Sequence, residues 1–143
     1  MKVFAGSSGY LIRLERGEEI HESLGTFARE QGIRGGVVQG IGAVHESEVG
    51  FYHLEKRVYE KRQIPEITEL LSLTGNLSQV DGKPFLHLHV VLMRPDFTVT
   101  GGHLFRSTIA VTGEFAFSET GLEVVRLPDP DVGLALLEPG PGG

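Results

Sequence analysis

The chain contains no cysteine, so disulfide bonds, thiolate zinc sites and thiol nucleophiles are all excluded. Any bound metal would have to be held by nitrogen and oxygen ligands, and six histidines are available. The sequence also lacks a run of about 20 apolar residues, which a membrane-spanning helix needs. The N-terminal segment MKVFAGSSGY has no apolar core of the kind found in signal peptides. We therefore expect a cytoplasmic protein with no membrane partner.

A basic cluster is missing as well. The formal net charge is -6, and the densest basic stretch (Lys56, Arg57, Lys61 and Arg62) is interleaved with Glu55 and Glu60. Proteins that bind nucleic acids normally carry a basic patch that releases counterions from phosphate. The alternation of charges is instead typical of a solvated surface, so direct binding of nucleic acid is not expected.

The composition indicates one folded domain. The chain has 143 residues, of which 40% are hydrophobic and 22% are charged, and these values are typical of a globular domain. We expect this domain to cover residues 1–128. The tail, residues 129–143, contains several prolines and glycines and is predicted to be irregular.

Short β-branched runs separated by many of the 20 glycines predict a fold rich in strands. One helix is predicted after Gly17, because apolar residues then recur at helical spacing: Ile20, Leu24, Phe27 and Ala28. Gly32 can end this helix in the left-handed conformation. His21 falls on the polar side of the helix and is predicted to face solvent without a ligand role.

A β-hairpin is predicted at Asp81-Gly82, a strong turn signal between two strand-like runs. The first run covers Ile67 to Val80 and the second covers Phe85 to Met93. Separate strands are expected at about Phe97 to Leu104, Ser107 to Phe117 and Leu122 to Leu127.

The second run of the hairpin carries the candidate site. Side chains alternate between the two faces of a strand, so His87 and His89 share a face opposite the apolar residues Leu86 and Leu88. If the next strand pairs with this one so that His103 lies opposite His89, a five-residue loop joins them and all three histidines share one face. A one-residue slip would move His103 to the other face.

Three imidazoles with an open fourth position are the ligand set of zinc or a similar divalent metal. We therefore predict a metal site at His87, His89 and His103. The alternative is a group of partly buried histidines that bond to the backbone and to each other.

Other polar residues are weaker candidates. Glu69 and Glu114 could orient an imidazole or act as a general base, and Arg106 could contact an anion. For each, a surface or interface role is the alternative. His45 and His53 lie beside acidic residues in surface-like sequence and are not expected to take part in chemistry.

Several segments in order resemble the plants-and-prokaryotes-conserved (PPC) family, in its prokaryotic stand-alone form. They cover most of the chain, from about residue 10 to residue 127: Gly40–Val44, Glu69–Leu77, Asp81–His89, Gly101–Leu104 and Thr112–Glu114. The resemblance implies an α+β domain with a twisted, mostly antiparallel sheet and one main helix, assembled as a homotrimer. It also implies metal positions at His87, His89 and His103.

The family has a DNA-binding label, which stems from plant relatives that bind DNA through AT-hook segments. No Arg-Gly-Arg hook occurs in this sequence. Two functions stay open: a trimeric module that binds a metal, with or without a small ligand, and a hydrolase or lyase in which the same ion activates water. The sequence does not identify a catalytic residue, so enzymatic activity is undecided.

Overall fold

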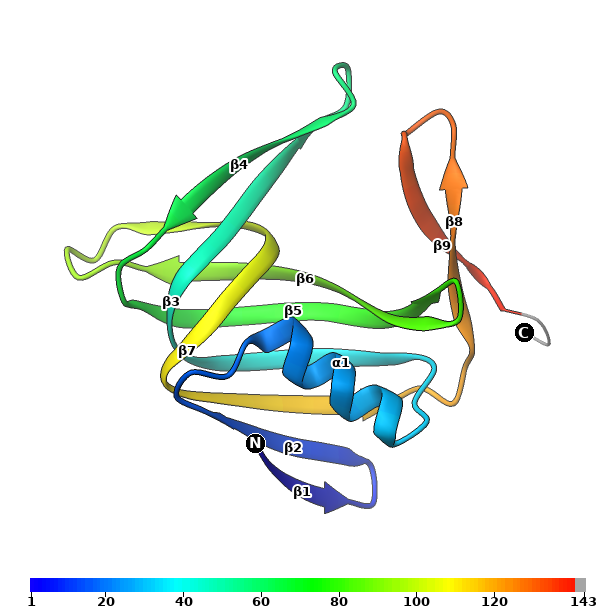
Figure 1. Cartoon of the computed structure of the whole chain (residues 1–143), viewed down its shortest axis with the longest axis horizontal. Coiled ribbons are helices and arrows are strands. Elements are labelled where there is room, and N and C mark those ends of the chain that lie inside the picture. Colours follow the sequence, from blue (N-terminus) through cyan, green and yellow to red (C-terminus); the bar gives the residue numbers. More distant parts are fainter. Residues whose placement is uncertain (141–143) are drawn as a thin grey trace.

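A computed structural model describes residues 1–140, which contain nine strands and one short helix (Figure 1). The elements in chain order are β1 (Lys2–Gly6), β2 (Gly9–Glu15), α1 (Ile20–Glu30), β3 (Gly36–His53), β4 (Val58–Ile64), β5 (Thr68–Val80), β6 (Lys83–Met93), β7 (Val99–Glu119), β8 (Val124–Asp129) and β9 (Leu134–Pro139). The mostly antiparallel sheet with one helix that the sequence predicts is confirmed. Within the described residues, no helix has the length and apolar character needed to cross a membrane.

The strands form one sheet in the order β1-β2-β7-β3-β5-β8-β9, with β4 paired to β3 and β6 paired to both β5 and β7. All described pairs are antiparallel except a single contact between β5 and β8. The long strand β7 changes partner along its length. Its first residues pair with β6, and the remainder pairs with β3 and β2. The two strands expected at 97–104 and 107–117 are therefore one continuous strand.

Helix α1 packs its apolar side on the sheet, as the spacing predicts. The four apolar residues at helical spacing are all buried: Ile20, Leu24, Phe27 and Ala28. Glu19 caps the N-terminus, because its side chain accepts a hydrogen bond of 2.8 Å from the backbone N–H of Glu22. Gly32 follows the helix with a φ of 70°, which confirms its predicted left-handed conformation.

The hairpin between β5 and β6 is also confirmed. Val80 pairs with Lys83, so Asp81 and Gly82 form a two-residue turn with φ values of 50° and 74°. Two positive φ values are characteristic of the type I′ turn, whose twist matches that of the flanking strands. The buried residues of β6 are Leu86, Leu88, Val90 and Leu92, which face the core.

The prediction of an irregular tail over 129–143 is wrong for most of its length. β8 and β9 pair in register from Val124↔Pro139 to Asp129↔Leu134 and form a hairpin. Its turn is stabilised by Asp129, whose side chain accepts 2.8 Å hydrogen bonds from the backbone N–H groups of Asp131 and Val132. Gly133 completes the turn with a φ of 77°. Residues 141–143 lie outside the described residues.

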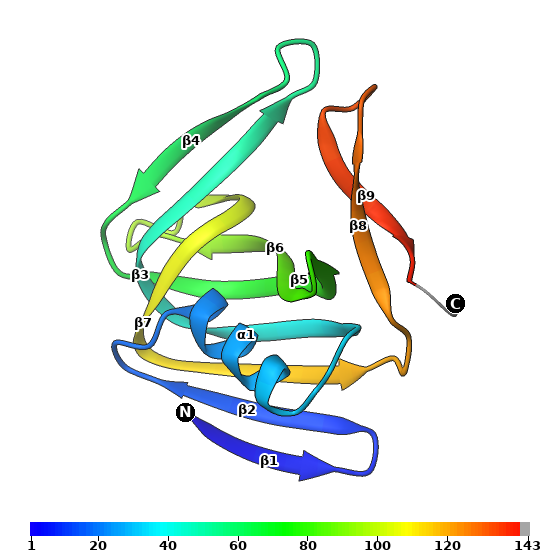
Figure 2. The ribbon, with the colours of Figure 1, turned by 45° about the vertical axis from the view of Figure 1, so that its right-hand side comes forward.

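Two hairpins extend from the same side of the sheet. In both ribbon views, the β3–β4 hairpin and the β8–β9 hairpin rise above β5 and β6, the first to the left and the second to the right (Figures 1 and 2). Tyr52 on β3 bridges the two hairpins, since its hydroxyl donates a hydrogen bond of 2.9 Å to the backbone carbonyl of Val132. The histidine-bearing part of β6 therefore lies between two projecting hairpins.

Candidate metal centre

The three predicted histidines lie together where β6 pairs with β7. His89 is the register partner of His103, and the loop between the strands covers residues 94–98, so the predicted register is confirmed. His87 and His89 point away from the core face that Leu86 and Leu88 occupy. The three rings are in contact, with centroids 5.0 to 5.5 Å apart.

Two glycines allow β7 to reach this position. β7 lies between β6 and β3 here, because His103 pairs with both His89 and Gly50. A Cβ atom at Gly101 would lie 2.2 Å from the carbonyl oxygen of Val90, and one at Gly102 would lie 2.7 Å from that of Gly50. Only a residue without a side chain permits such a close approach on both sides.

The ring nitrogens converge at the spacing that a metal requires. One nitrogen of each ring lies within 4.8 Å of the other two, and the Nε2 atoms of His87 and His89 are 3.2 Å apart. Three nitrogens each about 2.0–2.1 Å from a tetrahedral ion would be separated by about 3.3 Å. The pair formed by His87 and His89 already has this spacing, and His103 offers a third nitrogen within 4.8 Å of both.

The surroundings keep the imidazoles of His87 and His103 uncharged, which is the form that binds a metal. Burial lowers the pKa of His103 to about 4, and the nearby His87 and His89 rings reinforce the shift. Burial also lowers the pKa of His87, followed by the positive charge of Arg126. The Nδ1 atom of His103 is buried and has no hydrogen-bond partner in residues 1–140. The donor set, its spacing and this unpaired nitrogen fit a divalent ion.

A pocket of about 460 Å³ opens beside the histidines, within the usual size range of small-molecule sites. It lies at the edge of β6 that β7 leaves free, and α1, β4 and the β8–β9 hairpin complete it. None of its lining residues within 1–140 is acidic: His21, Gly25, Tyr59, Pro84, Phe85, Leu86, His87, His103, Leu104, Phe105, Arg126, Leu134, Ala135 and Leu136. His89 is exposed and does not line the pocket.

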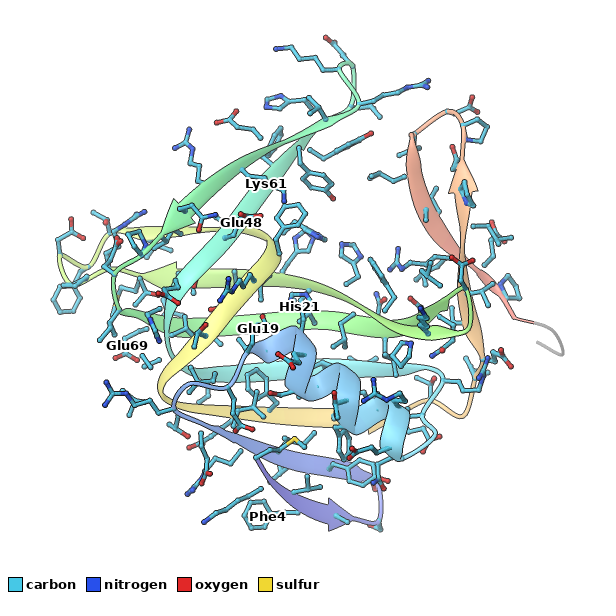
Figure 3. The ribbon with its side chains drawn as sticks, in the orientation of Figure 1. Phe4, Glu19, His21, Glu48, Lys61 and Glu69 are labelled. Carbon is cyan, nitrogen blue, oxygen red and sulfur yellow. The ribbon has the colours of Figure 1, made fainter. Side chains whose placement is uncertain are left out.

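His21 does not face solvent as predicted, although it is also not part of the three-histidine group. Its side chain is only 25% exposed and lines the same pocket as His87 and His103, and its Nδ1 atom is buried without a hydrogen-bond partner in the described chain. Figure 3 shows it near Glu19 at the start of α1. Helical periodicity placed His21 on the polar side, but that side faces a pocket whose other walls come from β6, β7 and the β8–β9 hairpin.

Sequence reasoning missed Arg126 altogether. Its guanidinium group donates hydrogen bonds to His87 Nδ1 at 3.2 Å, Asn76 Oδ1 at 3.0 Å and Ser78 Oγ at 3.0 Å. Arg126 lies on β8, close to the segment expected to be irregular. No motif in the sequence marks this arginine, because its contact with His87 depends on where β8 crosses β5.

The two weaker carboxylate candidates lie away from the histidines. Glu114 pairs with Ile41, so β3 and β5 separate it from β6, a distance of about 14 Å at the usual strand spacing. Glu69 is five residues from Thr74, the register partner of His89, which is about 16 Å along the strand. Figure 3 shows Glu69 at the end of the sheet opposite the β8–β9 hairpin.

The remaining candidates are also separate from the site. Arg106 is exposed and lines a different hollow, beside Glu18 and Glu19. His53 contacts Glu60 at 3.0 Å on the β3–β4 hairpin. His45 is half-buried and is not part of the histidine cluster.

The part of the chain that carries the three histidines matches a known protein family. The model of the Plants and Prokaryotes Conserved (PCC) domain matches residues 1–120. The chain belongs to this family. All three clustered histidines lie within the matched PPC residues, whereas Arg126 and the β8–β9 hairpin follow them.

Several solved structures are similar to this PPC domain over nearly its full length. A metal-containing protein from Archaeoglobus fulgidus is 38% identical, covers 95% of this chain and 98% of its own, and has a TM-score of 0.84. A PPC protein from Pyrococcus horikoshii is 34% identical over 96% of this chain and 94% of its own, with a TM-score of 0.85. A putative DNA-binding protein from Bacteroides thetaiotaomicron is 29% identical over 96% of each chain, with a TM-score of 0.92. No curated protein matches this chain.

Proposed function

We propose that this PPC protein binds one divalent metal ion per chain through His87, His89 and His103, and holds a small ligand in the adjoining pocket. The observation that carries this proposal is the convergence of one nitrogen from each ring on a common point. Support comes from the 38% identical relative, which is described as containing metal. Zinc is the best candidate, because imidazole suits it and the chain offers no thiolate for a softer ion.

A bound ion would supply a fixed positive charge and a Lewis acid at the wall of the pocket. Of the two functions left open by the sequence, the structure supports the binding module. A hydrolase or lyase of the predicted kind needs a pocket with a carboxylate within reach of the open coordination position. The pocket is present, but none of its lining residues in 1–140 is a carboxylate, and two strands lie between Glu114 and β6.

We also infer that the chain works as a homotrimer. Support comes from exposed apolar side chains on β1, β2 and β3: Phe4 on β1 and Leu11 on β2 are register partners, 59% and 62% exposed, and Ile41 on β3 is 56% exposed. Further copies of the chain would remove this apolar surface from water. The trimer itself is the assembly that the family resemblance implies.

Direct DNA binding receives little support. In the basic stretch of β4, Lys61 bonds to Glu48 at 2.7 Å and Arg62 bonds to Glu60 at 3.1 Å. Figure 3 shows the pair formed by Lys61 and Glu48 on the β3–β4 hairpin. Cations neutralised within the chain contribute little to phosphate binding. We infer that the protein does not retain duplex DNA at physiological salt, which a fluorescence anisotropy titration would test.

Elemental analysis of the untagged protein, combined with light scattering, tests the proposal. We expect about one zinc or comparable ion per chain, in a particle with three times the 15.6 kDa mass of one chain. A protein that is purified without metal and takes up no added zinc would contradict the metal site. A monomer that still carries one ion per chain would contradict only the trimer.

A further inference from the structure

Arg126 is a cation that lines the pocket without a counter-charge. It is half-buried, and its partners are all neutral: the side chains of Ser78, Asn76 and His87 and the carbonyl oxygen of Ala135. The structure shows no ion pair between Arg126 and a carboxylate anywhere in residues 1–140. A partly buried charge is costly when no opposite charge accompanies it. A bound anion would therefore supply the counter-charge that Arg126 lacks.

The guanidinium group is held in place rather than free to leave for solvent. Its Nε atom donates to Ser78 Oγ at 3.0 Å, and one Nη atom donates to the carbonyl oxygen of Ala135 at 3.0 Å. Its plane also lies near the Phe85 ring, with a distance of 5.2 Å from Cζ to the ring centroid. These contacts connect β8 to β5, β6 and β9, so the positive charge has a fixed position at the pocket wall.

The rest of the wall indicates what kind of anion fits. Most of it is apolar or aromatic, with side chains from β4, β6, β7 and β9: Tyr59, Phe85, Leu86, Leu104, Phe105, Leu134 and Leu136. The few other polar groups include His21, whose buried Nδ1 makes no hydrogen bond in the described chain and lies 3.7 Å from Glu19 Oε1. We propose that this pocket binds a small organic carboxylate with an apolar or aromatic body, whose carboxylate contacts Arg126.

A carboxylate fits better than a phosphate. The lining offers one guanidinium group and three imidazoles, and no second arginine or lysine is among its residues in 1–140. Phosphate sites usually combine several such donors around a group of higher charge. An apolar body matches the apolar walls and gains from leaving water.

The hydrogen bond between Arg126 and His87 links this site to the proposed metal site, on which the inference partly rests. Arginine can only donate, so His87 Nδ1 accepts this bond and the ring carries its proton on Nε2, facing His89. If His87 binds the metal through Nε2, its proton must lie on Nδ1 instead. There it would point at the N–H group of Arg126, which is also a donor. The metal-loaded form therefore releases an N–H of Arg126 for the carboxylate, and zinc and ligand should bind cooperatively.

Benzoate is a suitable probe, with benzamide as its neutral counterpart of nearly equal shape. Isothermal titration should show one benzoate site per chain in the zinc-loaded protein, weaker binding after treatment with a chelator, and no saturable binding of benzamide. R126Q should weaken benzoate binding on the order of tenfold or more, since it removes a charge-assisted hydrogen bond. R62Q is the matched control, because Arg62 is 79% exposed on the β3–β4 hairpin and should leave binding unchanged.

Three results would overturn the inference. Benzoate and benzamide could bind equally or both fail to bind; R126Q could bind benzoate as tightly as the wild type; or phenyl phosphate could bind more tightly than benzoate, which would assign the site to phosphates. If R126Q does not fold, the comparison of benzoate with benzamide on the wild type still decides. Benzoate binding in a protein that takes up no zinc would refute the metal site alone, and zinc uptake without benzoate binding would refute this site alone.

Discussion

Two hollows adjoin the first turn of α1, and they carry opposite charge. The histidine pocket on one side has Arg126 and no acidic residue among its described lining. The hollow on the other side is lined by four glutamates, Glu18, Glu19, Glu22 and Glu46, with Arg106 and the terminal amino group of Met1. Glu19 and His21, two residues apart, line different hollows (Figure 3).

The two hollows differ in whether their polar and charged groups have partners within the chain. In the acidic hollow, three of the charged groups have partners within the chain: the amino group of Met1 bonds to Glu18 at 2.8 Å, and Glu19 accepts hydrogen bonds from the backbone of Glu22 and Ser107. In the histidine pocket, His103 Nδ1 and the charge of Arg126 lack such partners in residues 1–140. The acidic hollow therefore stabilises the fold, whereas the histidine pocket has unused capacity for ligands.

Removing two of the three histidine ligands should change the histidine pocket more than any other substitution. The double variant H87A/H89A should lose its zinc, from about one ion per chain to a trace, because a single imidazole cannot replace a three-ligand set. Both side chains point away from the core, so Leu86 and Leu88 keep their packing and the circular dichroism spectrum should not change. Zinc content by elemental analysis and the spectrum are the two measurements.

The matched control is H45A/H53A, which removes two histidines that lie outside the cluster and should retain the metal. Unfolding of H87A/H89A with normal folding of the control would show that the cluster is structural. That result would favour the alternative that the sequence left open.

Removing the unpaired charge should have a smaller effect, and in the opposite direction. R126Q should bind zinc roughly tenfold more tightly, since it removes a cation next to the ion and frees His87 Nδ1 to carry a proton. A competition titration against a chromogenic chelator measures the change, with R62Q as control. Weaker zinc binding by R126Q would mean that Arg126 positions the His87 ring for ligation. The same variant should lose benzoate, so the two titrations separate the roles of ion and anion sites.

The part of the site that the sequence could predict is the part that depends on local pattern. The alternation of His87 and His89 follows from strand geometry, and the short loop over 94–98 limits the registers that bring His103 opposite His89. The turn at Asp81-Gly82 and the apolar stripe of α1 are local signals of the same kind. The sequence pattern alone predicts a fold rich in strands with one helix. The family resemblance adds the rest of the fold.

The missed parts depend on long-range packing. Arg126 meets His87 across 39 residues of sequence, through a single parallel contact of β8 with β5. Pro128 and the glycines near it suggested an irregular tail, but Pro128 lies in a strand that pairs on one side with β9, at Ala135. His21 has the right spacing for a solvent-facing residue, and only the neighbouring chain segments turn its surroundings into a pocket.

The acidic hollow should respond to pH through stability rather than through binding, with the smallest effect of the three. Burial opposes ionisation of Glu19, but the His21 ring 3.7 Å away and the backbone N–H groups of Glu22 and Ser107 outweigh it and lower its pKa to about 2, from 4.5. A lowered pKa contributes stability that is complete above pH 4.5 and is lost as the pH falls towards 2. E19Q should therefore reduce the free energy of unfolding by about 1–2 kcal/mol at pH 7, and the difference from the wild type should shrink below pH 4.5.

Urea titrations at pH 7, 4.5 and 3 measure this difference in the free energy of unfolding, with E22Q, an exposed neighbour, as control. A difference that stays constant over this range would show that the charge of Glu19 contributes nothing and that the cap acts through its hydrogen bond alone.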